Sequence, residues 1–337
     1  LAAGPAAQMR ASILFCAPLL ARLGRAETVL PGGCDIGARP IDLHRKGLEK
    51  MGVRSFFAGE RLVLTAPGGL HGAQITLDFP SVGATETLLL AAALAQGETV
   101  LRGAAREPEI ADLAAFLNRC GAVVQGAGSS TVRVQGRRRL TGCRYTPVAD
   151  RIAAATFACA CAAAGGRVEL AGCAPALYAP VLEILEQMGC RVQRGQDGAE
   201  VSRYGRLWGA GKVFTGAYPG LATDAAPLLA AVMVCAHSGS SVEDVIFERR
   251  FGCAEGFAAM GARVRVRGRQ FSVQPGGVLR GAEVAAPDLR GGAALVVAAL
   301  AAEGKTRVTR TGCIHRGYAG FDRELAALGA QIVREMR

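Results

Sequence analysis

A phrase that ends a helix recurs along this chain at nearly constant spacing. It reads LEKMG, LNRCG, LEQMG, FAAMG and LAALG, and its glycine stands at positions 52, 121, 189, 261 and 329. The successive spacings of 69, 68, 72 and 68 residues are too even for chance and indicate a repeated supersecondary unit. The chain is therefore built from five copies of one unit.

A second phrase repeats in step with the first. Apolar helical stretches end at Gly24, Gly97, Gly165, Gly239 and Gly304, and each is followed by a β-rich stretch such as ETVLRG. An amphipathic helix and two short strands then close the copy, so the unit reads strand, helix, strand, helix, strand, strand. We expect the apolar helices to be buried on nearly every side and the amphipathic ones to cover a sheet, an α/β arrangement.

The two ends of the chain depart from this scheme. About 30 residues separate Gly121 from Arg151, whereas only 8 residues follow Gly329. The last copy is therefore expected to lack its closing strands. A symmetric two-domain protein would hold an even number of copies, so we also expect a further segment to precede Leu1.

Composition narrows the classes of function. The formal net charge is +11, but the only basic cluster is 137–139 and aromatic residues are few, which argues against nucleic-acid binding and for small polyanionic substrates. No apolar run reaches the ~20 residues that span a bilayer, and we expect a cytoplasmic protein. The 11 cysteines form no CxxC pair and are expected to be mostly reduced core thiols; no metal or cofactor is predicted.

Charged residues occupy equivalent positions at the start of the apolar helices. Counted back from the closing glycine, this slot holds Arg10, Arg151 and Arg290, and Asp224 lies one residue earlier in the fourth copy. An arginine opposes the positive end of the helix dipole unless an anion binds beside it. A second slot, in the loop that enters the amphipathic helix, holds Arg39, Arg250 and Arg316. Each alone is equally well a surface arginine; their recurrence in register favours anion binding.

The loop Pro31–Pro40 contains Cys34, close to Arg39 and to a helix start at about Ile41, with Pro40 in its first turn. Such surroundings favour a reactive thiol, and the alternative is an inert loop cysteine. His44 and His315 are further candidates for facing a site, whereas His71 and His237 lie beside turns.

Several phrases together resemble one known family. They are MRASI, LPGGCDIGARPIDLH, PSVGATET, AAREPEI, ADRIA, YPGLATD, FERRF, DLR and HRGY, spread from Met9 to the C-terminal region. The family that they resemble is that of the UDP-N-acetylglucosamine 1-carboxyvinyltransferases, within the superfamily of 3-phosphoshikimate enolpyruvyl transferases. The resemblance implies two inside-out α/β barrel domains of three βαβαββ units each, at 1–148 (two units and the cysteine loop) and 149–337 (three units without closing strands).

The resemblance also implies an activity and its residues. The family transfers the enolpyruvyl group of phosphoenolpyruvate to the 3-hydroxyl of UDP-N-acetylglucosamine and releases phosphate, the first committed step of peptidoglycan synthesis. By this likeness Cys34 is the catalytic acid, Asp224 the base that accepts the sugar hydroxyl proton, and Arg316 a further catalytic residue. Substrate contacts are implied for Arg10, Arg39, Pro40, Ile41, Asp42, Leu43, Phe79, Pro80, Ser81, Val82, Asp224, Ile246, Arg250 and Arg290.

Some features depart from the family pattern. Alanines at 153 and 155, the stretch 225–227 and Arg249 stand where the family has other residues, and the family's Lys-Asn pair would precede Leu1. We therefore expect the 337-residue chain to be nearly inactive, and to work as a monomer on its two small substrates when extended upstream. The alternatives are a diverged, non-catalytic protein that binds a UDP-sugar, and a 3-phosphoshikimate enolpyruvyl transferase.

Overall fold

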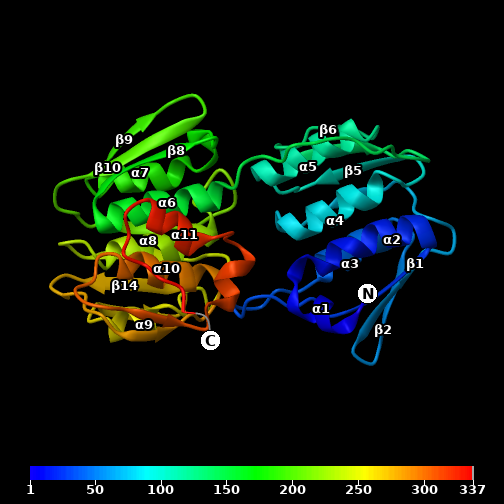
Figure 1. The fold of residues 1–337 in the computed structure, drawn as a ribbon. Helices are drawn as coiled ribbons and strands as arrows, with labels where there is room; N and C mark the ends of the chain where they lie inside the picture. Colours follow the sequence, from blue (N-terminus) through cyan, green and yellow to red (C-terminus); the bar gives the residue numbers. More distant parts are fainter. Residues whose placement is uncertain (336–337) are drawn as a thin grey trace. The chain divides into compact units, whose positions relative to one another are not determined.

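The computed structural model describes residues 1–335, which divide into two compact units of mixed α/β structure (Figure 1). The first unit comprises Leu1–Gly33 and Arg39–Val148. The second comprises the chain from Ala149 onward together with the short loop Cys34–Ala38, which the chain contributes from within its first half. Each unit has its own hydrophobic core.

The first unit carries helices on two small sheets. Its helices are α1 (Ala3–Gln8), the 3-10 helix η1 (Arg10–Phe15), α2 (Cys16–Leu23), α3 (Asp42–Lys50), α4 (Val82–Ala92) and α5 (Pro108–Arg119). Its strands are β1 (Arg25–Val29), β2 (Arg54–Ala58), β3 (Arg61–Thr65), β4 (Gln74–Thr76), β5 (Glu98–Arg102), β6 (Val123–Gln125) and β7 (Thr131–Gln135).

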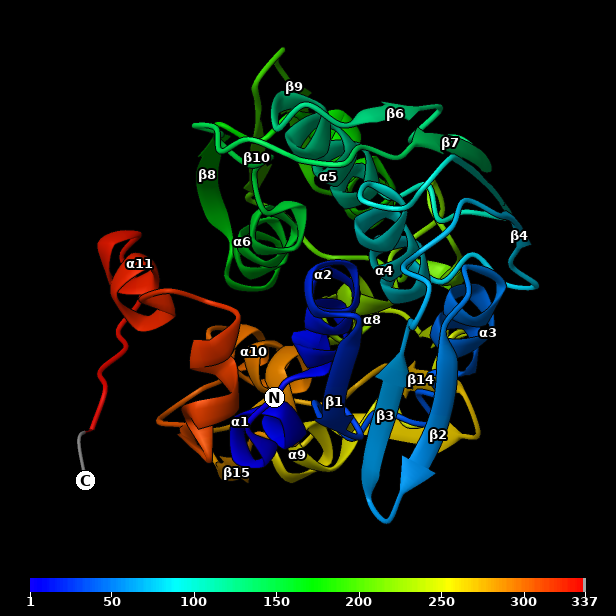
Figure 2. The same cartoon turned by 90° about the vertical axis from the view of Figure 1, so that its right-hand side faces the viewer.

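The strands of the first unit follow the repeat. One sheet has the order β1-β3-β2 and is antiparallel throughout, with Ala26 opposite Leu64 (Figure 2). The other has the order β4-β5-β7-β6, in which only β4 and β5 run parallel. Helix α4 packs against α2 and α3, and its leucines Leu88 and Leu89 are buried in the core between the sheets.

The second unit repeats the same elements. Its helices are α6 (Arg151–Ala164), η2 (Pro175–Leu177), α7 (Ala179–Gln187), η3 (Thr223–Ala225), α8 (Ala226–Met233), α9 (Ala254–Ala259), α10 (Leu289–Ala299), η4 (Thr311–Arg316) and α11 (Phe321–Ala327). Its strands are β8 (Gly166–Ala171), β9 (Arg191–Arg194), β10 (Gly198–Arg203), β11 (Gly211–Phe214), β12 (Ser240–Glu243), β13 (Arg263–Arg267), β14 (Gln270–Gln274), β15 (Glu283–Ala285) and β16 (Arg307–Thr309).

Three helices form the centre of the second unit. Helices α6, α8 and α10 pack against one another, and the sheets β8-β10-β9, β11-β12-β14-β13 and β15-β16 lie around them (Figure 1). Every residue of α8 is buried. The abundant alanine of these helices allows their backbones to approach closely, while their leucine and valine side chains supply the apolar area that stabilises the unit.

A glycine brings an outer helix close to a buried one at the same point of two copies. In the first unit, a Cβ atom at Gly47 of α3 would lie 2.6 Å from a methyl carbon of Leu88 on α4. In the second unit, a Cβ at Gly256 of α9 would lie 2.4 Å from a methyl carbon of Leu295 on α10. The absence of a side chain at each glycine therefore sets the distance between the two helices.

The sequence predicts most of these elements correctly, with two differences. The first apolar helix is interrupted by η1 and is not buried on every side, since Phe15 is 52% and Leu23 70% exposed. Helix α3 begins at Asp42, so Pro40 precedes it and is not in its first turn. Between Leu328 and residue 335 the described chain forms no strand. The described helices are all too short or too polar to cross a bilayer.

Candidate functional site

The carboxylate of Asp224 is held by two arginines in the second unit. Asp224 lies in η3, directly before α8 and one residue ahead of the predicted slot. Its Oδ1 accepts a hydrogen bond from Nη2 of Arg250, and its Oδ2 lies 3.1 Å from Nε of Arg290. Arg250 is 2% exposed, whereas the Asp224 side chain remains 38% exposed. The structure thus brings together three of the predicted site residues, from η3, from the turn before α9 and from the first turn of α10.

The electrostatics of this cluster favour an ionised carboxylate. Burial by itself raises the pKa of Asp224, but the charges and hydrogen bonds of Arg250 and Arg290 outweigh it, so the pKa is lowered from its usual value. The pKa of Arg290 is raised: burial opposes its charge, and the neighbouring Asp224 carboxylate more than compensates. A carboxylate in this state is able to accept a proton, provided that its arginine partners have another anion to bind.

A second, fully buried carboxylate orders the surroundings of Arg250. Asp244 accepts hydrogen bonds from the backbone N–H groups of Ile246 at 2.8 Å and Phe247 at 2.9 Å. The hydroxyl of Thr223 also donates to Asp244, and Arg250 Nε lies 4.0 Å from it. Asp244 therefore fixes the turn that carries Ile246 relative to the loop that carries Asp224. The sequence reasoning missed Asp244, because nothing local distinguishes it from a surface aspartate.

Arg290 is positioned by its helix and by an aromatic ring. The side chain of Asp288 caps α10 by accepting hydrogen bonds from the N–H groups of Arg290 and Gly291, both at 3.0 Å. The guanidinium carbon of Arg290 lies 5.1 Å from the ring centroid of Tyr318, whose hydroxyl is 2.8 Å from that of Thr156. The Nη1 atom of Arg290 is buried and has no hydrogen-bond partner among the described residues. This nitrogen is available to an oxygen of a ligand.

The loop of Cys34 is anchored on the segment 247–249 of the second unit. Asp35 pairs with Arg249 at 2.6 Å, and the N–H of Ala38 donates to Oε2 of Glu248 at 3.1 Å. The backbone N–H of Arg249 also donates to the carbonyl of Ile36 at 2.9 Å. Arg249, which stands where the resemblance predicts another residue, thus contributes a contact that no sequence signal indicated.

The thiol of Cys34 lies beside a predicted catalytic arginine. Its Sγ is 3.9 Å from Nη2 of Arg316, at the end of η4. The Cys34 side chain is partly exposed. A thiol beside a guanidinium and open to solvent has the access and the electrostatic surroundings of a reacting group. A loop cysteine with a purely structural role would need neither.

In the first unit, two predicted arginines are brought together. Arg10, at the start of η1, donates from Nη2 to the carbonyl of Pro40 at 3.1 Å. Burial and the positive charge of Arg39 lower the pKa of Arg10 to about 10. Two arginines that repel each other across a short distance are stabilised by an anion between them, which is what their position in the repeat predicts.

The stretches predicted to contact the nucleotide flank one depression of the first unit. Leu43 and the segment 75–78 line this depression, and Phe79, 45% exposed, follows the segment directly. Ser81 caps α4 by accepting a hydrogen bond from the N–H of Ala84 at 3.3 Å. The predicted stretches 39–43 and 79–82 are therefore neighbours, although 35 residues separate them.

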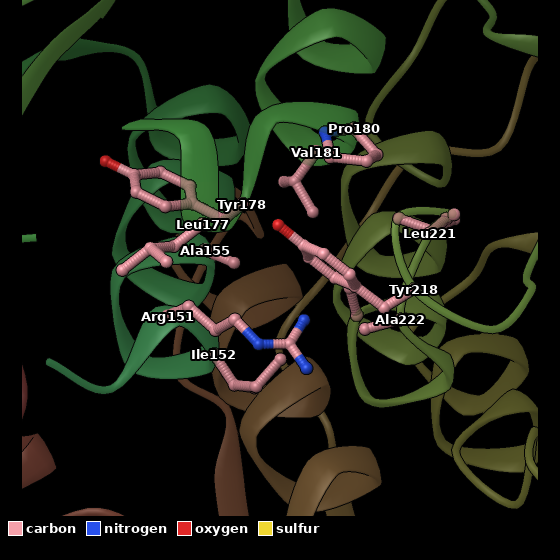
Figure 3. Close-up of a pocket in the computed structure, with 12 residues that line it drawn as sticks. Arg151, Ile152, Ala155, Leu177, Tyr178, Pro180, Val181, Tyr218, Leu221 and Ala222 are labelled. Carbon is pink, nitrogen blue, oxygen red and sulfur yellow. The ribbon is translucent and has the colours of Figure 1, made fainter. Parts of the chain in front are cut away.

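Arg151 has a different environment from the other arginines of its slot. It lines a small cavity with Tyr178 and Tyr218, and its guanidinium carbon lies 5.8 Å from the Tyr218 ring centroid (Figure 3). The hydroxyl of Tyr178 is buried and has no hydrogen-bond partner within 1–335. His44, a further candidate from the sequence, is 4% exposed in the core beside Gly83, and His315 lies next to Arg316 in η4.

Comparisons with known proteins agree on one group of enzymes. The sequence model of the family "EPSP synthase (3-phosphoshikimate 1-carboxyvinyltransferase)" matches residues 2–325. A UDP-N-acetylglucosamine 1-carboxyvinyltransferase of Finegoldia magna is 45% identical over 97% of the chain and 78% of its own length. A protein of the same name from Acidiphilium cryptum is 47% identical, again over 97% of the chain and 78% of its own length.

Solved structures show the same architecture. The enolpyruvyl transferase NikO from Streptomyces tendae superposes with a TM-score of 0.81 at 26% identity, covering 95% of the chain and 76% of NikO. An EPSP synthase from Acinetobacter baumannii superposes with a TM-score of 0.70 at 22% identity, covering 97% of the chain and 78% of its own length. The predicted two-domain inside-out α/β barrel is thereby confirmed.

Proposed function

Because this chain belongs to the UDP-N-acetylglucosamine 1-carboxyvinyltransferase family, we propose that it transfers the enolpyruvyl group of phosphoenolpyruvate to the 3-hydroxyl of UDP-N-acetylglucosamine and releases phosphate. The observation that carries this proposal is the pair of chemical groups in the second unit. One is an ionised carboxylate, Asp224, held by Arg250 and Arg290; the other is a partly exposed thiol, Cys34, beside Arg316.

The proposed roles follow from what the reaction requires. Protonation of the methylene carbon of phosphoenolpyruvate needs an acid, for which Cys34 is the candidate. The sugar hydroxyl must lose its proton as it attacks, and Asp224 is the candidate base. Phosphate then leaves the tetrahedral intermediate as the methyl carbon loses a proton again, which restores the double bond of the enolpyruvyl group. The negative charge of the phosphate needs arginines, for which Arg250, Arg290 and Arg316 are the candidates.

The pairing of Asp224 with arginines supports an order of events in which the anionic substrate binds before Asp224 accepts a proton. Without substrate, Arg250 and Arg290 stabilise the carboxylate and lower its pKa, which makes it a weak base. A bound phosphate or carboxylate offers the same arginines stronger, bidentate partners. Asp224 is then left with fewer hydrogen bonds and becomes a better proton acceptor. In this proposal the anionic substrate itself activates the base.

The first unit contributes the remaining candidates. Arg10 and Arg39 are suited to an anionic part of a substrate, because each raises the electrostatic cost of the other's charge. The adjoining stretches 39–43 and 79–82 are proposed to hold the uridine nucleotide, with Ile246 as a further contact. We further propose that the protein acts as a cytoplasmic monomer at the first committed step of peptidoglycan synthesis, an interpretation that the family likeness supports.

The acceptor of the enolpyruvyl group decides between this proposal and its nearest rival. The test measures phosphate release from phosphoenolpyruvate with UDP-N-acetylglucosamine or with shikimate 3-phosphate as acceptor. Because the chain aligns with 78% of the length of its relatives, the assay compares the 337-residue chain with a version extended by any upstream coding sequence. Turnover only with the UDP-sugar supports the proposal; turnover only with shikimate 3-phosphate would overturn it.

The non-catalytic alternative gives a different result in the same experiment. A diverged UDP-sugar-binding protein would bind UDP-N-acetylglucosamine in calorimetry and release no phosphate in either form. The family's Lys-Asn pair, which would precede Leu1, and the altered stretch 225–227 beside Asp224 are the sequence features that motivate this alternative.

A further inference from the structure

Two cysteines that the proposed reaction does not use are in contact in the first unit. Cys120 follows the last residue of α5, and Cys143 lies in the extended segment 136–150 that connects β7 to α6. Their Sγ atoms are 3.5 Å apart, and both are free thiols. This distance allows an S–H···S hydrogen bond, whereas most cysteines of the chain lie buried in the core.

The connecting segment is held along α5 on both sides of Cys143. Thr141 donates from its backbone N–H, at 2.9 Å, and from its hydroxyl, at 3.2 Å, to the carbonyl of Cys120. Further along, the Tyr145 hydroxyl donates to Oδ1 of Asp112 at 2.7 Å, and the N–H of Val148 donates to the same atom at 3.0 Å. The thiol contact is therefore fixed by the backbone and does not depend on two mobile side chains meeting by chance.

The two thiols differ in access to solvent. Cys120 is 7% exposed, whereas Cys143 is only half-buried. Burial and the hydrogen bond with Cys143 raise the pKa of the Cys120 thiol. A small oxidant therefore reaches Cys143 first, and Cys120 is placed to react with the oxidised sulfur.

We propose that Cys120 and Cys143 are a redox modification site, at which a peroxide converts the two thiols into a reversible disulfide. The Cys143 sulfur attacks the O–O bond of hydrogen peroxide, one oxygen becomes its sulfenic acid, and the other leaves as water. The Cys120 sulfur then attacks the oxidised Cys143 sulfur and displaces the sulfenic oxygen, which leaves as the second water as the S–S bond forms. Two thiols lose two protons and two electrons, and one peroxide is reduced to two waters.

The disulfide would change how firmly the connecting segment is attached. Hydrogen bonds, a ring contact and the packing of Leu140 on the core hold it in place now, and such non-covalent contacts open transiently. A covalent bond at Cys143 would close a loop through β6 and β7 and keep the segment on α5 during such openings. A dithiol reductant would release it. The segment between β7 and α6 would thus be less mobile under oxidising conditions and more mobile under reducing ones.

Peptide mapping of the oxidised 337-residue chain tests this proposal without any assay of activity. The reduced protein is treated with hydrogen peroxide, its remaining thiols are alkylated, and it is digested with trypsin. We expect a linked pair of peptides, Cys120–Arg133 with Leu140–Arg144, that disappears on treatment with dithiothreitol. The Cys143→Ser variant should lose this pair. The Cys235→Ser variant, which removes an equally half-buried thiol elsewhere, should keep it.

A second measurement on the unmodified sequence guards against misfolding of a variant. Limited trypsin treatment of the native protein should cut after Arg144 at least several-fold more slowly in the oxidised than in the reduced form, because the bond holds this residue on α5. Separate alkylation of Cys120 and Cys143 after peroxide treatment, or a disulfide from Cys143 to any other cysteine, would overturn the proposal. Equal cleavage rates of a confirmed disulfide form would overturn the predicted effect on the segment.

Discussion

Arg290 donates a hydrogen bond from Nε to Oδ2 of Asp224 across 3.1 Å, although 66 residues separate them in the sequence. The two residues occupy almost the same slot in neighbouring copies of the repeat. Internal repetition has therefore placed a negatively charged side chain against a positively charged one. From the sequence alone, these were only two charged residues at helix starts. Because Arg250 binds the other oxygen, the carboxylate has a cation on each side.

Replacing Asp224 with asparagine should remove the proposed base and keep most of the shape of the site. We expect kcat to fall by roughly 10²-fold to 10⁴-fold, the usual range for loss of a general base, with the KM for UDP-N-acetylglucosamine changed only a few-fold. Steady-state phosphate release measures both constants. Glu243→Gln, on the nearby strand β12, serves as a control of equal charge change and should retain activity. A kcat within threefold of the parent would exclude Asp224 as the base.

The hydroxyl pair of Tyr318 and Thr156 should be measurable as a coupled contribution to stability. Thr156→Val leaves the buried Tyr318 hydroxyl without its partner and is expected to cost about 1–3 kcal/mol. Tyr318→Phe should cost about 1 kcal/mol, because the Thr156 hydroxyl retains its bond to the carbonyl of Ile152.

A double-mutant cycle by urea unfolding separates this pair from its neighbours. We expect the double variant to be less destabilised than the sum of the two single ones by on the order of 1 kcal/mol. Strict additivity would show that the two hydroxyls do not interact in solution.

His44 should make the first unit sensitive to mild acid. Burial and the charge of Arg10 lower its pKa from 6.5 to about 4, with Asp42 acting weakly in the opposite direction. A histidine whose folded pKa is depressed contributes stability that is full above pH 6.5 and is lost as pH falls toward 4, here up to about 3 kcal/mol. Unfolding free energies of the parent at pH 7.5, 6, 5 and 4 measure this loss.

Variants at two histidines assign that pH dependence. His44→Leu, which cannot be protonated, should flatten the stability profile between pH 6.5 and 4. His71→Gln removes an exposed histidine from the same unit and should leave the profile unchanged. If the parent and His44→Leu lose stability in parallel over this range, the buried imidazole is not the group responsible.

Cys34 should be the thiol that reacts with the epoxide antibiotic fosfomycin, as the family likeness implies. Peptide mass mapping after incubation is expected to show one adduct, on Cys34, and none in the Cys34→Asp variant. Cys313→Ser, at a partly exposed thiol in η4, should still be modified at Cys34. An adduct on another cysteine, with Cys34 unmodified, would remove the case for a special thiol in this loop.

The sequence predicts the helices and strands of this structure, but not the contacts between residues that are far apart in the chain. The glycine register predicted that Arg151 and Arg290 begin buried helices, because the apolar pattern and the glycine at a helix end are local signals. The contact of Tyr318 with Thr156 joins residues 162 positions apart and depends on how η4 packs on α6 and α10, which no local pattern encodes.

The exposed side of α2 has a similar explanation. The repeat gives α2 the position that α8 has in its own copy and therefore predicts the same burial. Helix α2, however, carries Arg22 and contacts α4 alone among the buried helices, whereas α8 has a buried helix on both sides. The burial of a helix depends on the elements that pack against it as well as on its own residues. The pairing of Arg249 with Asp35 was likewise invisible, because it joins a loop of the first half of the chain to a turn of the second.

The close approach of Gly47 to Leu88, and of Gly256 to Leu295, limits which substitutions are tolerated at these positions. A side chain at either glycine would overlap a leucine methyl group, so an alanine there is tolerated only if the facing leucine becomes smaller or moves. Each glycine and its leucine should therefore vary together among related chains. Because the same pair occurs in two copies of the repeat, the same restriction applies to the helix spacing of both units.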